Sequence, residues 1–542
     1  MSEKERVVER LVVYGMVYGM VRGMVRVEAR AMGIPVDSLL AAEDQHGRAL
    51  DMLRRYWGYE SFRPGQWDAI SGLLSGRNVL AVLPTGTGKS LCFQLPALLR
   101  EGVAVCVSPL IALMTDQVGR LNQRGIPATY IGSNLSRSEQ RSRWSGASAG
   151  SYRLVYIAPE QLKADAFRSF VANATVSFVA IDEAHCISEW GHAFRPAFRR
   201  IGAQIPRRPI IAVTATATAR VQSDIIRALR MSNALRVATG FDRPNIHWSV
   251  ERGVNRRAFI SRLMQRVEPT IAYCATRRST DTWAAWLRSQ GVPASSYHAG
   301  MDRGARLRSQ DEWTLGRTAI MVATSAFGMG IDRADVRRVV HLAMPGSLSA
   351  YYQEAGRAGR DGQPAEAILL YRDADVPLQR AMIEKTLKDA LARRGPRGRP
   401  AALRARSIAI RSLNAMRRYV FSKRCRRHTL LVHFGEPAPA RCGSCETCDR
   451  MADEAAAYAR DEITAGALMQ TIAEGRLDWS SVAALPRHER TVLGKLARDG
   501  LLQRADDLDA TIEVATYPDA PGRYPDPPRR TRSSVKRSTI LS

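Results

Sequence analysis

Short, mostly apolar runs recur through residues 50–375 and alternate with stretches long enough for helices. The runs are 78–83, 103–107, 154–157, 178–181 and 210–213 in the first half of this region, and 270–273, 319–322, 339–342 and 367–370 in the second. Strands buried on both faces of a parallel sheet have this composition, and helices provide the crossovers between them. The pattern therefore predicts an α/β chain with two parallel sheets in tandem, in domains at 50–240 and 241–376.

A glycine-rich segment follows the first run and has the composition of a phosphate-binding loop. Its residues are Thr85, Gly86, Thr87, Gly88, Lys89 and Ser90. The glycines would let backbone N–H groups approach phosphates, Lys89 would neutralise the β and γ phosphates, and the Ser90 hydroxyl would bind Mg²⁺. Leu83 stands where the strict pattern has its first glycine, so the segment alone is equally compatible with an ordinary glycine-rich turn.

Two acidic residues end the run 178–181 and complete the expected nucleotide site. Asp182 would face the metal ion, and Glu183 would orient or deprotonate the attacking water, with His185 close by in the same motif. The loop and the acidic pair occur in the order and spacing of a nucleoside triphosphatase. Together they predict that the chain binds ATP and Mg²⁺ and hydrolyses the nucleotide.

Positive charge dominates the chain. Lys and Arg number 80 against 52 Asp and Glu, which gives a formal net charge of +28. Such an excess suits a polyanionic partner, although a chain-wide bias toward Ala, Arg and Gly from genomic base composition would produce it too. No run of about 18 uncharged apolar residues and no secretory signal is present, so we expect a soluble, cytoplasmic protein.

Four of the eight cysteines cluster in a region with helical character at 377–455. They are Cys425, Cys442, Cys445 and Cys448, the last three at three-residue intervals. Four thiolates satisfy tetrahedral Zn²⁺ and leave no open position, so the cluster predicts a structural zinc site. Free or disulfide-bonded thiols are the alternative.

Three segments have compositions that favour disorder. Residues 1–49 contain a repeat with a glycine at every fourth position, which disfavours a stable helix, and we expect this extension to be dispensable, with Met32 or Met52 as the true start. Residues 393–400 form a basic Pro/Gly insert, either a mobile loop or an inert linker. The tail 517–542 is rich in Pro, Arg and Ser and is predicted to be disordered.

Residues 456–516 have the pattern of a small separate domain. Two or three helices are expected first, followed by strands at 501–503 and 511–514. This order predicts a small winged-helix-like domain.

With these motifs in place, residues 58–448 resemble a RecQ-type DNA helicase of superfamily 2. The resemblance implies two RecA-like domains, a helical zinc-binding module and a winged-helix-like domain. It also implies a segment that reads adenine, in which Gln66 grips the edge of the base while Tyr59 and Arg63 pack on its face.

The resemblance assigns three residues to DNA contacts in loops that connect strands and helices. Ser108 and Thr218 lie in segments similar to loops that grip one strand, and His298 lies in a similar motif of the second domain. A structural role as helix caps explains Ser108 and Thr218 equally well.

An aromatic segment follows the acidic motif and is similar to a loop peculiar to this family. Trp190 and Phe194 beside Arg195 would form a stacking platform for single-stranded bases. Glu189 and Ala193 depart from the Gln and Asp that the family favours, which puts the coupling of DNA binding to hydrolysis in doubt. Aromatic side chains packed in the protein core are the alternative.

Arg357 and Arg360 lie three residues apart in the last motif, a spacing that places both on one face of a helix. The resemblance implies that they reach across the interdomain cleft to the γ-phosphate, with Arg360 as the arginine finger.

The implied function is ATP-dependent 3′-to-5′ DNA unwinding in DNA repair or recombination. We expect a nucleoid-associated monomer that acts on single strands and duplex junctions. A DNA-stimulated ATPase or translocase that remodels nucleoprotein without strand separation is the alternative. An RNA helicase and a catalytically inactive scaffold fit less well, because Lys89, Asp182, Glu183 and Arg360 are all present.

Overall fold

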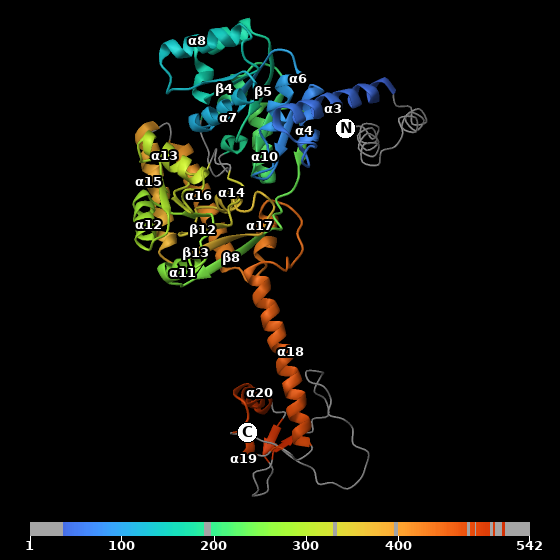
Figure 1. Cartoon of the computed structure of the whole chain (residues 1–542), viewed down its shortest axis with the longest axis vertical. Coiled ribbons are helices and arrows are strands. Elements are labelled where there is room, and N and C mark those ends of the chain that lie inside the picture. The colour runs from blue at the N-terminus through green and yellow to red at the C-terminus, as the bar shows by residue number, and fades with distance from the viewer. Residues whose placement is uncertain are drawn as a thin grey trace. The chain divides into compact units, whose positions relative to one another are not determined.

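The computed structural model describes residues 36–188, 197–328, 333–394, 399–473, 477, 479–482, 484–498, 502–504 and 512–514. The chain separates into two compact units, residues 1–445 and 446–542. Figure 1 shows two sheet-containing lobes in the first unit, one drawn in blue to green and the other in green to orange. Among the helices of the described residues, none combines the length and the apolar character needed to cross a membrane.

Seven parallel strands form the sheet of the first lobe, in the order β3-β4-β2-β5-β6-β1-β7. The strands are β1 (Val79–Val82), β2 (Val103–Val107), β3 (Ala128–Ile131), β4 (Leu154–Ile157), β5 (Val176–Ile181), β6 (Ile210–Thr214) and β7 (Leu235–Ala238). Every residue of β1 to β6 is buried, because helices cover both faces of the sheet.

The helices of this lobe are α3 (Val36–Trp57), α4 (Gln66–Leu74), α5 (Leu91–Gln94), α6 (Pro96–Leu99), α7 (Ile111–Gln123), α8 (Arg137–Ser148), α9 (Asp165–Asn173) and α10 (Ala219–Leu229). Short 3₁₀ helices lie at η1 (Pro159–Lys163), η2 (Ala184–Ile187) and η3 (Phe198–Ala203). Helix α8 begins with a capping box, in which Ser136 and Glu139 each satisfy a backbone N–H of the other.

Helix α3 begins at Val36, inside the segment 1–49 for which we expected disorder. Ala49 and Leu53 on this helix are fully buried and pack against residues of α4 and α5. The expectation is therefore wrong for residues 36–49, which belong to a helix that docks on the first lobe through Ala49 and Leu53. Residues 1–35, which contain the glycine repeat, lie outside the described residues.

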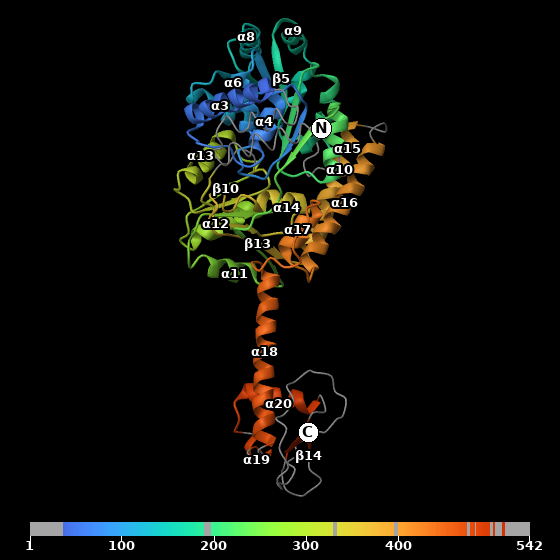
Figure 2. The same cartoon turned by 90° about the vertical axis from the view of Figure 1, so that its right-hand side faces the viewer.

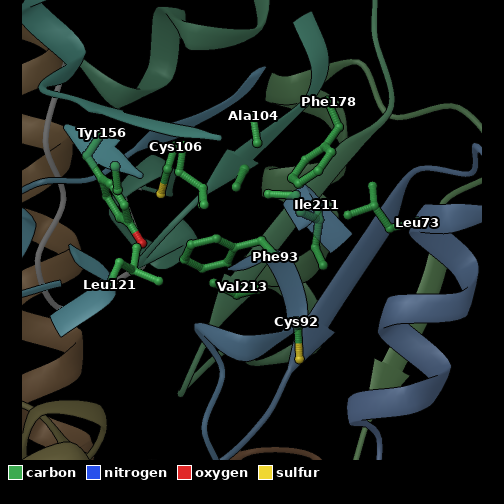
Figure 3. Packing of buried hydrophobic residues seen from close by; sticks show 14 of the residues in the cluster. Leu73, Cys92, Phe93, Ala104, Cys106, Leu121, Tyr156, Phe178, Ile211 and Val213 are labelled. Carbon is green, nitrogen blue, oxygen red and sulfur yellow. The ribbon is translucent and has the colours of Figure 1, made fainter. Parts of the chain in front are cut away.

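The core of the first lobe fixes the short helix that follows the phosphate loop. Figure 3 shows Phe93 of α5 with Leu121, Tyr156 and Val213 around it. The Phe93 and Tyr156 rings meet edge to face with centroids 6.3 Å apart. The side-chain nitrogen of the adjacent Gln94 donates to the Tyr156 hydroxyl at 2.9 Å. These contacts hold the end of the loop against the sheet.

The second lobe has a six-stranded parallel sheet in the order β10-β11-β9-β12-β13-β8. Its strands are β8 (Ile246–Arg252), β9 (Thr270–Tyr273), β10 (Ala294–Tyr297), β11 (Ile320–Ala323), β12 (Arg338–His341) and β13 (Ala365–Tyr371). Its helices are α11 (Arg256–Leu263), α12 (Arg277–Ser289), α13 (Arg303–Thr314) and α14 (Leu348–Ala355). Two tandem parallel sheets were predicted, and this part of the fold class is confirmed.

Three helices follow the second sheet within the first unit: α15 (Asp375–Arg394), α16 (Arg399–Phe421) and α17 (Arg426–His433). Figure 2 shows α15 and α16 running along each other. The sequence between them, 395–398, belongs to the predicted basic insert and lies outside the described residues.

The second unit contains three helices and a strand pair. Its elements are α18 (Glu446–Ala473), α19 (Trp479–Val482), α20 (Arg487–Arg498), β14 (Leu502–Arg504) and β15 (Ile512–Val514). The two strands are antiparallel. Helices α18 and α20 share a hydrophobic core, which includes Leu468, Ile472, Val492 and Leu496. The predicted helices and strand pair are confirmed, while the winged-helix arrangement stays a prediction. The tail 517–542 lies outside the described residues.

Candidate nucleotide and nucleic-acid site

The phosphate loop connects β1 to α5 and takes its shape from two glycines. Gly86 and Gly88 have φ angles of +84° and +77°, in the left-handed region that other residues avoid. Lys89 folds back over the loop, and its Nζ donates to the Pro84 carbonyl at 3.2 Å. Burial lowers the pKa of Lys89, whereas the nearby carboxylates of Glu183 and Asp182 raise it. The lysine and the acidic pair therefore share one site.

Gln66 lies against the phosphate loop. Its side-chain amide is hydrogen-bonded to backbone groups of the loop and of the neighbouring Arg63. Its Nε2 donates to the carbonyls of Thr87 at 2.7 Å and Gly88 at 3.3 Å, and its Oε1 accepts from the Arg63 backbone N–H at 2.9 Å. The side chain is 3% exposed. In this conformation the Gln66 side chain supports the loop. Recognition of adenine stays a prediction, and it requires the amide to give up one of these bonds for a bond to the base.

The other two residues of the predicted adenine site are open to solvent. Tyr59 is 52% exposed, and the exposed Arg63 guanidinium donates to the Gly86 carbonyl. Gly65 precedes α4 with φ +75°, and a Cβ there would lie 2.3 Å from the Thr239 side chain. Only glycine fits this position, so the turn that presents Arg63 and Gln66 is fixed by sterics.

Asp182 and Glu183 follow β5 directly. Asp182 is 7% exposed, and its Oδ1 accepts from the Glu183 backbone N–H at 2.9 Å. Glu183 has φ +48°, a left-handed conformation that is strained for a residue with a Cβ. Burial and the Glu183 charge raise the pKa of Asp182 to about 7, while Lys89 lowers it. Carboxylate and hydroxyl oxygens are the ligands that Mg²⁺ prefers, so Asp182 and Ser90 fit that ion.

His185 connects the acidic motif to the end of β6. Its Nδ1 lies 3.0 Å from the Thr214 hydroxyl and 3.2 Å from the Glu183 carboxylate. Burial alone would lower the pKa of His185, but Cys186 and Glu183 raise it to about 10. A protonated imidazole can thus donate to Glu183 and hold it in place. The segment after β6 continues to Thr218, which is a predicted DNA contact. The His185–Thr214 contact therefore links the hydrolytic residues to that segment.

Arg357 and Arg360 lie in a turn rather than on a helix. Helix α14 ends at Ala355, and both arginines occupy the turn at 356–362. The prediction that helical spacing brings them together is therefore wrong, because the helix ends before both residues. Arg360 nevertheless lies beside Gly86 of the phosphate loop, whereas Arg357 lies beside Gly328 of the second lobe.

Arg360 packs on the phosphate loop of the first lobe. A Cβ on Gly86 would lie 3.1 Å from the Arg360 Cγ. The Arg360 charge also acts on Lys89, where it adds to the effect of burial in lowering the lysine pKa. The phosphate-loop site thus receives cationic groups from both lobes.

Arg357 is 5% exposed and carries unused donors. Within the part of the chain that the structure describes, its Nε and Nη1 have no hydrogen-bond acceptor. A Cβ on Gly328 would lie 3.0 Å from its Nη2, just before the undescribed residues 329–332. A buried guanidinium with unused donors suits an anionic ligand.

Hydrogen bonds to backbone carbonyls hold the arginine turn in place. The Thr85 hydroxyl of the phosphate loop donates to the Gly356 carbonyl at 2.9 Å, across the two lobes. Arg243 and Asn245, between the two sheets, donate to carbonyls of the same turn. Sequence analysis missed Arg243 and Asn245, because backbone acceptors leave no signal in the residue types of a motif.

Ser108 and His298 are both buried in this structure, and their predicted DNA contacts stay predictions. Ser108 is 0% exposed at the end of β2, and it does not cap α7. His298 is 7% exposed; its Nδ1 accepts from the Gly300 N–H at 3.2 Å, and its Nε2 lies 3.0 Å from the Asp281 carboxylate. Internal bonds hold His298 in place, whereas the buried Ser108 hydroxyl has no hydrogen-bond partner among the described residues.

Thr218 has the helix-capping role that was the alternative to a DNA contact. It is the N-cap of α10, where its hydroxyl accepts from the Val221 N–H at 3.5 Å. The side chain stays partly exposed and lines a cavity of 640 Å³ that also involves residues of the second lobe. A cap and a DNA contact are compatible here, and the DNA contact stays a prediction.

The predicted aromatic platform lies outside the described residues. Trp190, Phe194 and Arg195 fall within 189–196, as do Glu189 and Ala193. The assignments to single-stranded bases therefore stay predictions.

The four clustered cysteines come together. Their sulfurs all lie within 4.8 Å of one another, and those of Cys425 and Cys445 are 3.8 Å apart. A tetrahedral site with Zn–S bonds of about 2.3 Å separates two sulfurs by about 3.8 Å. Backbone N–H groups of His428 and Ser444 point at Cys425 and Cys442 at 3.4 Å each, as in thiolate sites. The donor set and the spacing fit Zn²⁺.

Three family models match the chain in succession. Residues 63–225 match the DEAD/DEAH box helicase family, 255–362 match the helicase conserved C-terminal domain, and 373–449 match the RecQ zinc-binding family. The last match covers all four cysteines, so the predicted zinc module is confirmed.

Curated relatives extend the likeness across most of the chain. The ATP-dependent DNA helicase RecQ of Haemophilus influenzae is 40% identical over 406 residues, which cover 74% of this chain and 63% of the relative. The protein of the same name from Bacillus subtilis is 40% identical over 408 residues, covering 74% and 67%. The chain thus spans somewhat less than two thirds of the first relative.

Among solved structures, the DUF1998 helicase MrfA bound to DNA superposes with a TM-score of 0.51 at 20% identity. This match covers 60% of the present chain and 51% of MrfA. At this identity the likeness concerns the fold alone.

Proposed function

Because the chain belongs to the RecQ family of ATP-dependent DNA helicases, we propose that it couples ATP hydrolysis to 3′-to-5′ movement along DNA and to strand separation. The family membership agrees with the resemblance inferred from the motifs. DNA is the proposed partner, bound as single strands and at duplex junctions, and we propose a monomer that serves DNA repair or recombination. We also propose a cytoplasmic, nucleoid-associated location.

The contact of Arg360 with the phosphate loop is the observation that carries this proposal. Lys89, Asp182 and Glu183 come from the first lobe and Arg360 from the second, yet the charges of the other three all act on Lys89, and Arg360 packs on Gly86 of the phosphate loop. A nucleotide bound there would contact both lobes. Its hydrolysis would remove part of that contact and let the lobes move, which is what a motor requires.

The side chains of the site take complementary roles in the proposed reaction. Lys89 neutralises the β and γ phosphates, Ser90 and Asp182 hold Mg²⁺, and Glu183 accepts a proton from the attacking water while His185 fixes its position. Mg²⁺ supplies charge neutralisation between the phosphates. Arg360 stabilises charge that develops on the γ-phosphate, with the unused donors of Arg357 beside it.

Recognition of the base and of DNA involves more exposed residues. Tyr59, Arg63 and Gln66 are proposed to read adenine. Trp190, Phe194 and Arg195 are proposed to stack on single-stranded bases, and Thr218 to contact the backbone. These contacts involve phosphates and base faces, so binding should depend little on sequence and strongly on salt.

Strand displacement measured beside DNA-stimulated ATP turnover tests the proposal. We expect unwinding of forked and 3′-tailed duplexes, no unwinding of 5′-tailed duplexes, and loss of all activity in Lys89→Ala. Turnover without displacement would support the translocase alternative. Turnover that DNA does not stimulate would contradict both.

A further inference from the structure

The segment between the two sheets makes an unusual set of bonds to the arginine turn. The Arg243 guanidinium donates to three carbonyl oxygens: Gly356 at 2.9 Å, Ala358 at 2.7 Å and Gly359 at 3.1 Å. Two residues on, the Asn245 side-chain nitrogen donates to Gly359 at 2.8 Å and to Gln363 at 2.9 Å. The turn that carries Arg357 and Arg360 is therefore fixed at both ends from outside.

The Gly356 carbonyl is the point where three parts of the site meet. It accepts from Arg243 and also from the Thr85 hydroxyl of the phosphate loop, each at 2.9 Å. Arg357 is the next residue, and Arg360 follows shortly after. Any shift of this carbonyl would move both arginines relative to the phosphate loop.

The turn cannot hold this position by its own backbone preferences. It contains glycines at 356, 359 and 362, which have the widest conformational freedom. Close packing replaces that missing restraint: a Cβ on Gly356 would lie 2.7 Å from the Thr85 hydroxyl, and one on Gly359 would lie 2.4 Å from the Asn245 nitrogen. The shape of the turn depends on the groups that donate to it.

Arg243 itself is anchored by its neighbours. The Phe241 N–H donates to the Glu436 carboxylate, and Asp242 forms an ion pair with Arg427. The Phe241 ring stacks on Phe434 with centroids 4.6 Å apart. Arg427, Phe434 and Glu436 all lie between the first and second cysteines of the cluster. The segment is thus held against the module that the cysteines organise.

We propose that Arg243 is a positioning residue for ATP hydrolysis, which fixes the turn that presents Arg357 and Arg360 to the γ-phosphate. The inference rests on the proposed function. The planar guanidinium offers several donors in a fixed fork, so one side chain can lock three carbonyls, which a lysine ammonium on a flexible stem cannot do with the same precision. A misplacement of about 1 Å at such a site can cost about 10² in rate.

Steady-state kinetics of Arg243→Ala and Arg243→Lys provide the test. We expect kcat for DNA-stimulated ATP hydrolysis to fall about 10²-fold in Arg243→Ala, with KM for ATP and the affinity for single-stranded DNA within about twofold. Arg243→Lys should recover only part of kcat. If Arg243→Ala is poorly folded, Asn245→Ala provides the same comparison with a smaller loss.

A double-mutant cycle separates positioning from general stability. If Arg243 acts through Arg360, the variant with both replaced by alanine should lose no more kcat than Arg360→Ala alone. Multiplicative losses would overturn the proposal.

Arg338→Ala is the matched control. Arg338 likewise donates to two carbonyls, those of Leu263 and Arg266, but it is more buried than the partly exposed Arg243 and supports a different part of the second lobe. The Arg338→Ala variant should have a lower thermal midpoint and a kcat near normal. If both variants show the same loss of stability and kcat, Arg243 has only a structural role.

The Arg360→Ala variant distinguishes this inference from the proposed function. A collapse of kcat in Arg360→Ala with normal kcat in Arg243→Ala overturns the inference alone. Normal kcat in Arg360→Ala contradicts the assigned role of Arg360 and the inference with it.

Discussion

At the scale of single residues, the acidic pair is the most constrained part of the site. Glu183 occupies a left-handed backbone conformation, which costs of order 1–3 kcal/mol for a residue with a Cβ. His185 lies 3.2 Å from its carboxylate. This strain and this contact aim one oxygen of Glu183, which is what a residue that activates water requires.

Replacement of Glu183 by glutamine should therefore separate binding from hydrolysis. Glu183→Gln keeps the size of the side chain and removes the base, so we expect ATP turnover to fall by about 10²–10⁴ with nucleotide affinity retained. Lys89→Ala should lose affinity as well, because it removes a phosphate contact. Measurement of nucleotide binding beside turnover checks both variants, and substantial turnover in Glu183→Gln would assign the base elsewhere.

Two of the residues predicted to contact DNA share one property that sequence analysis did not reveal. Ser108 and His298 lie in motifs at loop tips, yet the structure buries both. Burial of one hydroxyl or imidazole depends on the neighbours that pack over it, and a motif does not specify those neighbours. Lys89 and Asp182 were expected in one site, and they do act on each other, because the phosphate loop follows β1 and Asp182 directly follows β5.

At the scale of elements, the predicted strands differ from the missed ones by their place in the sheet. In the two parallel sheets, sequence analysis found the nine interior strands and missed β3, β7, β8 and β10, which are the edge strands of those sheets. Interior strands are mostly apolar because helices cover both faces. Edge strands such as 294–297, with sequence ASSY, carry polar residues and give no comparable signal.

Helix α3 offers a prediction about the start of the described chain. Deletion of residues 1–35 should leave stability and ATP turnover unchanged, whereas deletion of 1–57 should destabilise the first lobe. Leu53→Ala in the intact chain should cost about 2–5 kcal/mol of unfolding free energy, because Leu53 is fully buried. Thermal or denaturant unfolding checks all three, and an unaffected Leu53→Ala would show that α3 is not docked in solution.

The cysteine cluster predicts a metal-dependent element. Burial raises the pKa of the Cys425 thiol, so ionisation of this thiol requires a cation beside it. We expect Cys445→Ser to lose Zn²⁺ and to lower the thermal midpoint by roughly 5–10 °C, equivalent to a few kcal/mol.

Cys274→Ala is the control for this prediction. Burial raises the pKa of Cys274 to about 12, and it lies outside the cluster, so this variant should keep its metal. Equal metal content in Cys445→Ser and the unmodified protein, measured by atomic spectroscopy, would contradict the assignment.

At the scale of the whole molecule, the nucleotide site depends on contacts between distant parts of the chain. The Thr85 hydroxyl and the Gly356 carbonyl are 271 residues apart in sequence. Motif order predicted that the two lobes share one nucleotide. The bonds that set their registry could not be predicted, since most of the acceptors are backbone carbonyls and any residue supplies one.

The net charge of +28 leads to the last prediction, which decides between a DNA-binding surface and a compositional bias. For single strands, the slope of log Kobs against log salt is about −0.7 for each phosphate contact. Arg195→Ala should therefore make the slope shallower by about 0.7. Trp190→Ala should lower affinity by about 1–3 kcal/mol at every salt concentration, because stacking is not ionic. A slope near zero in the unmodified protein would assign the excess charge to composition, and equal slope changes in both variants would contradict the stacking role of Trp190.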